Sequence, residues 1–185
     1  MSFKVPVSQV ENLRVMLRRI VGVARLNGSV FRSLKEDHAA TSQSLLILGT
    51  VGLSFGLGFA TSLGTDLREI LLGAVVGGAV AFVLGFVWLS LSYLVGTRLF
   101  RGTTTYWGLA RPLFFSSSPG LIFLLTIIPV RPIQDVARSV GVAWIAIASV
   151  SAVKNALGFD SQRGFMTFII VAFIILITYG LFSSI

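Results

Sequence analysis

The sequence contains no cysteine and a single histidine, His38. Without thiols it forms neither disulfides nor thiolate metal sites, and one histidine without other ligands does not make a zinc site. We therefore expect no metal and no cofactor. His38 could bind a tetrapyrrole or act with Glu36 and Asp37, but a hydrated residue before the first membrane span is the simpler interpretation.

Acidic residues are also scarce, seven against fifteen lysines and arginines, and none falls inside a long apolar run. Proton relays and ion-coupled pumps place carboxylates within the membrane, so this distribution argues against them. The sequence has no GxSxG, HExxH or P-loop motif. Serines within the apolar runs lack a general base. We expect no catalytic residues and classify the protein as a non-enzyme.

Apolar residues, in contrast, dominate the chain. They make up 55% of its 185 residues, and charged residues make up 12%, against about 25% in ordinary soluble domains. The mean hydropathy is +0.90. A soluble core of this size would need a polar shell that the chain lacks, so the surplus apolar surface must face lipid. The sequence predicts an all-α, polytopic integral membrane protein that does not bind nucleic acid.

Five apolar stretches are long enough to cross a hydrocarbon core of roughly 30 Å as helices. They cover residues 44–63, 70–97, 113–130, 139–157 and 165–182. The connections are too short for a soluble domain. We therefore divide the chain into a basic tail, residues 1–43, and a five-helix transmembrane domain, residues 44–185. The tail has no compact apolar region with a cleavage site, so we do not expect a signal peptide.

The basic residues are distributed unevenly between the two sides of this five-span arrangement. Twelve belong to the tail and to the second and fourth connections, whereas three, Arg68, Arg131 and Arg138, belong to the first and third. Cytoplasmic connections carry the excess of lysine and arginine. We therefore expect a multi-pass protein of the cell (inner) membrane, with the N-terminus in the cytoplasm and the C-terminus outside.

The tail predicts two helices separated at Asn27-Gly28, with Ser29 as the N-cap of the second. Apolar residues of the first helix recur at spacings of three and four. They form one stripe, consisting of Val10, Leu13, Leu17, Ile20 and Ala24.

Basic residues form a second line along the same tail. The line consists of Arg14, Arg18, Arg25 and, if the break preserves the helical phase, Arg32. Basic amphipathic helices lie at the surface of anionic membranes, so these arginines are candidate contacts for anionic lipid head groups. The alternative, compatible with this one, is a helix packed on the cytoplasmic ends of the spans with its arginines solvated.

Small residues recur at every fourth position in the first two spans. They are Gly52 and Gly56 in the first and Gly73, Gly77, Ala81 and Gly85 in the second. Such ladders let helix backbones approach closely in lipid. They predict packing within one bundle or, alternatively, a contact with another integral membrane protein or a second copy. From the length of the second ladder we predict a permanent partner contact through the first two spans.

The third span is the least regular because it contains SSSPG at residues 116–120. Pro119 removes a backbone donor, and Gly120 follows it, so these two residues are the candidate helix break. The simpler interpretation is a kinked helix whose serines satisfy the freed carbonyls. A broken helix lining a substrate path is the alternative, but transporters usually carry such breaks in matched pairs, and no second break is evident.

Three stretches of the sequence resemble the Yip-domain family of Ypt/Rab-interacting membrane proteins, and in particular its short prokaryotic members. They are VFRSLKEDHAATSQSLLILG (30–49), RLFRGTTTYWGLARPLFFSSSPGLIFLL (98–125) and WIAIASVSAVKNALGFDSQRGF (144–165). The resemblance implies five helices and a cytoplasmic N-terminus, with no catalytic residues to transfer. His38 departs from it, because proline is expected there. The characteristic motifs of eukaryotic members are not evident, so an association with Rab GTPases is not carried over.

These observations together favour a non-enzymatic membrane scaffold or accessory subunit that packs against other membrane proteins and lipid. A small transporter or channel that uses the broken third span is the alternative. A polar cavity at the break would favour transport.

Overall fold

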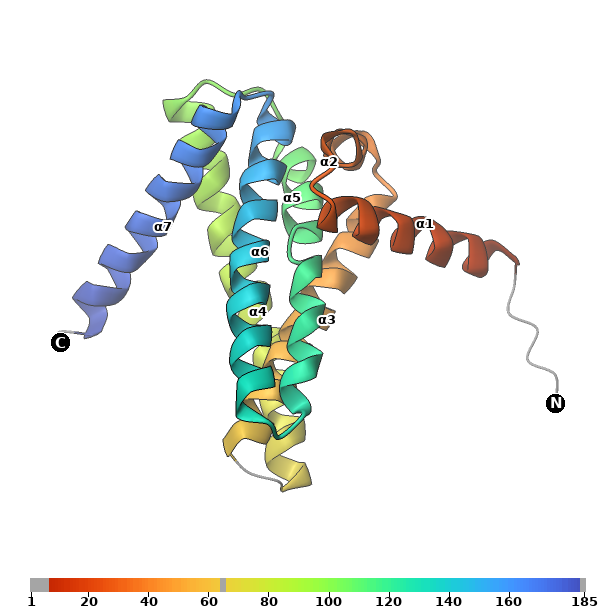
Figure 1. Ribbon diagram of the computed structural model, residues 1–185. Helices are drawn as coiled ribbons and strands as arrows, with labels where there is room; N and C mark the ends of the chain where they lie inside the picture. The colour runs from red at the N-terminus through yellow and green to blue at the C-terminus, as the bar shows by residue number, and fades with distance from the viewer. Residues whose placement is uncertain (1–6, 64–65, 184–185) are drawn as a thin grey trace.

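The computed structural model describes residues 7–63 and 66–183, and this part of the chain is helical, with no strand. Figure 1 shows the arrangement of the helices, several of which run side by side in a bundle. In chain order the elements are α1 (Val7–Ala24), α2 (Gly28–Glu36), α3 (Ala40–Leu63), α4 (Leu67–Leu94), the π-helical turn η1 (Val95–Leu99), α5 (Tyr106–Phe115), the 3₁₀ helix η2 (Ser118–Ile127), α6 (Arg131–Leu157) and α7 (Ser161–Ser183).

Five stretches of the described chain are long and apolar enough to cross a membrane. They are Ala40–Thr61, Leu67–Leu99, Tyr106–Ile127, Arg131–Leu157 and Ser161–Leu181. The predicted all-α fold with five spans is therefore confirmed. The protein is a polytopic membrane protein.

The third and fourth spans begin earlier in the chain than hydropathy indicates, because a polar cap and a proline fix where their first helices begin. The Thr105 side chain accepts a hydrogen bond of 3.0 Å from the Gly108 N–H and so caps α5. Pro132 stands in the first turn of α6, where a missing N–H costs nothing. The assignment of Arg111 and Arg138 to connections was therefore wrong, because they lie within α5 and α6.

The third span changes helix type at the SSSPG sequence. The α-helix ends at Phe115, and a 3₁₀ helix begins at Ser118, with Pro119 in its first turn. Gly120 lies where a Cβ atom would come within 2.6 Å of a Val51 methyl group on α3. The break therefore coincides with a close approach of α3 to the third span.

The small-residue ladders of α3 and α4 face each other. A Cβ on Gly56 would lie 2.1 Å from the Gly73 carbonyl oxygen, and one on Gly77 would lie 2.5 Å from the Gly52 carbonyl oxygen. A partner subunit could reach these atoms only by separating the two helices. At Gly85 the nearest atom belongs to the flexible Leu48 side chain, at 2.9 Å, so the fit is looser there.

The spans differ in how much protein covers them. In the most apolar stretch of each span, 67% of the residues are buried in the third span, against 11% in the second and 17% in the fifth. Figure 1 shows α7 leaning away from α6 along its length and α1 projecting sideways from the bundle. The irregular third span is thus the centre of the fold, and α4 and α7 are its periphery.

The turn between α1 and α2 differs from the expected one in its cap. Asn27, and not Ser29, is the N-cap of α2, since its Oδ1 accepts a 3.0 Å hydrogen bond from the Ser29 N–H. Ser29 already lies inside the helix. The preceding residue, Leu26, has φ of 56°, a left-handed conformation that favours glycine.

Candidate functional site

The short helix α2 is clamped onto the bundle by its apolar face. Phe31 and Leu34 are fully buried there. On the polar side, Arg32 Nη1 donates to Asn155 Oδ1 of α6 at 3.0 Å, and Lys35 Nζ donates to the Thr103 carbonyl at 3.3 Å. Arg32, a member of the predicted line of basic residues in the tail, is exposed, but it also attaches α2 to α6.

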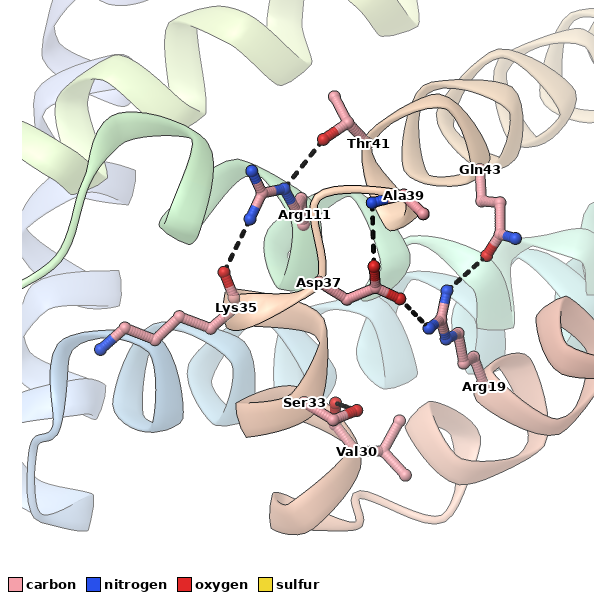
Figure 2. A network of polar contacts seen from close by, with 9 residues as sticks. All are labelled: Arg19, Val30, Ser33, Lys35, Asp37, Ala39, Thr41, Gln43 and Arg111. Carbon is pink, nitrogen blue, oxygen red and sulfur yellow. Dashed lines mark hydrogen bonds and ion pairs between the residues drawn. The ribbon is translucent and has the colours of Figure 1, made fainter.

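Arg111 of α5 forms hydrogen bonds with the connection between α2 and α3. Although Arg111 is only 4% exposed, its guanidinium has three acceptors, which come from both helices and the turn between them. Nη1 donates to the Lys35 carbonyl at 2.8 Å and Nε to Thr41 Oγ1 at 2.8 Å (Figure 2). Nη2 contacts His38 Nδ1 at 3.0 Å.

The position of this guanidinium has an electrostatic reason. The Lys35 carbonyl is one of the last four of α2, which have no partner within the helix and carry the negative end of its dipole. A buried cation is tolerated when such acceptors surround it. Because a guanidinium only donates, Nδ1 of His38 is the acceptor. We call the Arg111 guanidinium and its acceptors at Lys35, His38 and Thr41 the Arg111 cradle. His38 belongs to it although its side chain is exposed.

A second arginine ties α1 to the same turn. Arg19 pairs with the Asp37 carboxylate, and its Nη1 donates to Gln43 Oε1 at 2.7 Å (Figure 2). The other carboxylate oxygen of Asp37 accepts the Ala39 N–H at 2.9 Å. Burial raises the pKa of Asp37, but the hydrogen bonds from Arg19 and Ala39 and the charge of Arg111 outweigh it, so the pKa lies below its ordinary value.

The C-terminal end of α1 is held by a residue 120 positions away. The indole Nε1–H of Trp144 on α6 donates to the Ala24 carbonyl at 3.0 Å. Val23, one residue earlier, is fully buried. Helix α1 is therefore fixed to the bundle at its end, and Arg19 fixes it about one turn earlier.

Beyond these attachments, α1 has three sectors along its length. Met16, Ile20 and Val23 pack on the protein core. The second sector is apolar and uncovered, with Leu13 52%, Leu17 51% and Val21 49% exposed. The third holds the exposed arginines Arg14, Arg18 and Arg25. At 100° per residue the basic sector directly borders the uncovered apolar sector.

The predicted apolar stripe of α1 is therefore divided by the structure. Ile20 packs on the protein core, whereas Leu13 and Leu17 are about half exposed. Only the backbone of Val10 is described. An uncovered apolar sector next to a basic one is the arrangement of a helix lying in the membrane interface. The candidate site is therefore the exposed surface of α1.

Sequence reasoning missed the residues that hold this helix in place, above all Arg19 and Arg111. For Arg111 a signal was available. It stands between Ala110 and Pro112 in an apolar segment, and an arginine in such a segment needs buried acceptors. Arg19 offered no comparable signal, because it stands among other arginines of the tail.

A family model for the Yip1 domain matches residues 21–182. The chain belongs to the Yip1 domain family. The suspected Yip-domain resemblance is thereby confirmed. No curated protein and no solved structure shows significant similarity to the chain. The part that matches the Yip1 domain includes α2, the Arg111 cradle and all five spans, whereas most of α1 precedes it.

The helix break of this Yip1 domain borders a cavity of about 410 Å³. Three of its fourteen lining residues are serines, and the others are apolar. Ser116 Oγ donates to the Leu113 carbonyl at 2.6 Å, and Ser117 Oγ donates to the Phe114 carbonyl at 2.7 Å. These serines therefore bond backbone carbonyls in the last turn of α5. Pro119 and Gly120 do not line this cavity.

The described residues contain no group of three or more histidine, cysteine, aspartate or glutamate side chains that could hold a metal ion. The polar groups brought together around α2 include three arginines with their acceptors, Arg19, Arg32 and Arg111. This arrangement holds helices in place.

Proposed function

We propose that this Yip1-domain protein is a non-enzymatic membrane scaffold that acts on the lipid bilayer through α1. In this proposal the five spans anchor the protein in the cell membrane with the N-terminus on the cytoplasmic side. Helix α1 lies in the cytoplasmic interface, its apolar sector among acyl chains and its arginines against anionic head groups.

The observation that carries the proposal is the half-exposed apolar sector of Leu13, Leu17 and Val21. A helix kept in water would be expected to bury such a sector against the bundle, as α2 does. Each basic residue close to an anionic surface adds on the order of 1 kcal/mol of attraction. The three exposed arginines beside the apolar sector therefore favour an anionic membrane over a neutral one.

The attachments of α1 determine how such a helix would act on lipid. A freely tethered amphipathic helix changes its depth and direction independently of its anchor. Here Arg19, Val23 and the Trp144 hydrogen bond hold α1 to the bundle, and it projects sideways (Figure 1). Each copy would therefore insert a fixed wedge into one leaflet, which favours a curved or locally thinned bilayer.

Reconstitution of the full chain into anionic vesicles tests this function. Vesicle diameters measured by cryo-electron microscopy are expected to fall with increasing wild-type protein. The variant Leu13→Ser/Leu17→Ser/Val21→Ser should insert equally but leave the diameters unchanged, whereas Val75→Ser, at a 65% exposed position of α4, should behave as wild type. Equal diameters for wild type and the triple variant would refute the proposed action on lipid.

A role as accessory subunit is a second candidate, supported by the groove between α4 and α7. This groove has a volume of about 650 Å³ and includes the hydroxyl-bearing residues Ser90, Thr178 and Tyr179. Ser90 and Thr178 already bond Tyr106 and the Ile174 carbonyl, but Tyr179 is 73% exposed and presents its hydroxyl to a neighbouring helix, and hydrogen bonds between helices contribute to their association in membranes. A partner helix in the groove, from another membrane protein or a second copy, should be captured by photo-crosslinking from position 179 but not from position 75.

Transport has less support than either role. The cavity at the break is mainly apolar, and the hydroxyls of Ser116 and Ser117 are already bonded to the backbone. A polar substrate would find few partners there.

A further inference from the structure

Arg138 of α6 lies in a small cavity at the end of the bundle opposite α2. The cavity holds about 260 Å³ and is lined by Phe55 and Phe59 of α3, Phe123 and Thr126 of η2, and Arg138 itself. At this end α3 and η2 end and α4 and α6 begin (Figure 1). None of these residues contributes to the α1 surface or to the Arg111 cradle.

One nitrogen of the Arg138 guanidinium lacks an acceptor in the described part of the chain. Its Nη2 atom is buried and has no hydrogen-bond partner among the described residues. Asp135 is exposed one turn earlier on α6, yet the ion pairs found in this part of the chain do not include it. Arg111, the other deeply placed arginine, has three acceptors. A buried guanidinium donor without an acceptor is costly, so an acceptor from a bound ligand would stabilise it.

We propose that this cavity binds the phosphate group of a phospholipid from the adjacent leaflet. The planar fork of a guanidinium matches the oxygens of a phosphate. The cavity is slightly smaller than the roughly 300–1,000 Å³ of small-molecule pockets, so it accommodates a phosphate and its glycerol but not a whole lipid.

The surroundings of Arg138 favour a lipid over a free anion. Phe55 is 47% exposed and Phe59 54% exposed, and these rings lie on the surface of a membrane span. A lipid phosphate arrives there with its hydrocarbon against the rings, whereas a dissolved anion would have to pass them.

The depth of Arg138 also fits a lipid head group. It lies seven residues into α6, or about 10 Å from Arg131 along the helix. Side chains of a helix lean toward its N-terminus, here toward the connection between η2 and α6, so the guanidinium lies closer to the head-group level than the Arg138 backbone does.

Native mass spectrometry of the purified full chain tests the site with two lipids that differ only in the phosphoglycerol head group, a phosphatidylglycerol and the diacylglycerol with the same acyl chains. Wild type should retain phosphatidylglycerol preferentially. Arg138→Gln should weaken this binding by about tenfold or more, the effect of losing a charged hydrogen bond. The matched control is Arg131→Gln, at an exposed arginine about two helical turns earlier on α6. It should change the affinity for phosphatidylglycerol by less than about twofold.

Three results would overturn the proposal. They are equal retention of the two lipids, unchanged binding in Arg138→Gln, and displacement of phosphatidylglycerol by inorganic phosphate at millimolar concentration, which would make the site one for a free anion. If Arg138→Gln does not fold, the comparison of the two lipids on the wild-type protein decides the question. Arg138→Lys, which keeps the charge and loses the fork, should then show intermediate affinity.

Discussion

Helices α1 and α2 are neighbours in the basic tail, and both are amphipathic, but α1 leaves part of its apolar face exposed. In α2, Phe31 and Leu34 are fully buried, whereas in α1, Leu13 and Leu17 are about half exposed. Each helix holds to the protein through one arginine, Arg19 of α1 through Gln43 and Arg32 of α2 through Asn155, but α1 carries three further exposed arginines, Arg14, Arg18 and Arg25. The comparison indicates that α2 completes the protein core and that α1 presents a surface to the membrane.

The largest expected effect is the difference in stability lost when an apolar residue of α2 or of α1 is truncated. Phe31→Ala removes a fully buried ring and should lower the free energy of unfolding by about 3–5 kcal/mol. Leu17→Ala, at a 51% exposed position, should lower it by less than about 1 kcal/mol. Thermal unfolding of the two variants in the same detergent measures the difference. Similar losses would mean that α1 is covered by protein in the folded state.

The Arg111 cradle gives the next largest effect, because it joins α2 to the spans. Arg111→Met keeps the apolar stem but leaves the Lys35 carbonyl and His38 Nδ1 without their donor, at an expected cost of about 2 kcal/mol. Arg98→Met, at an exposed arginine of η1, should cost less than about 0.5 kcal/mol. Equal melting temperatures for these two variants would show that the cradle does not hold α2.

The attachment of α1 through Asp37 predicts a dependence on pH. The pKa of Asp37 is lower in the folded protein than its ordinary value. Its contribution to stability is therefore complete above the ordinary pKa and is lost as the pH falls through the lowered value. The melting temperature of wild type should exceed that of Asp37→Asn at pH 7, and this difference should shrink as the solution becomes strongly acidic.

A suitable control for this titration is Asp160→Asn, since Asp160 faces Arg163 at 3.9 Å with both side chains well exposed. Such a surface pair contributes little. A difference between wild type and Asp37→Asn that stays constant from pH 7 to strong acid would contradict the role given to the Asp37 carboxylate.

The smallest expected effect concerns the turn that sets the angle between the two helices. Leu26 has φ of 56° and is 38% exposed. Leu26→Gly should relieve the left-handed conformation and raise the free energy of unfolding by about 1 kcal/mol, seen as a small rise in melting temperature. Destabilisation would show that the Leu26 side chain makes a contact worth more than the strain.

The sequence was sufficient to predict five spans, an amphipathic tail and its break, because these depend on local composition and periodicity. It could not predict what covers each face. Leu17 and Phe31 both lie on apolar stripes, yet lipid is proposed to cover the first and protein covers the second. Periodicity identifies an apolar face but does not identify its neighbour.

The other features that the sequence did not predict are contacts between residues far apart in the chain. The Trp144 hydrogen bond to Ala24 and the Arg111 contacts with Lys35 and Thr41 join segments 70 to 120 residues apart. No local pattern encodes them. The ladder of α4 illustrates the same point, because its spacing allowed internal or external contact, and the structure places Gly77 against Gly52 of α3.

The most direct test of the membrane position of α1 uses the absence of cysteine from the chain. Single cysteines at positions 13–25 can carry a spin label, whose accessibility to oxygen reports lipid and whose accessibility to a polar nickel complex reports water. In liposomes we expect oxygen accessibility to be highest at positions 13, 17 and 21, nickel accessibility highest at 14, 18 and 25, and both low at 16, 20 and 23. High nickel accessibility at 13, 17 and 21 would place α1 in water and contradict the account.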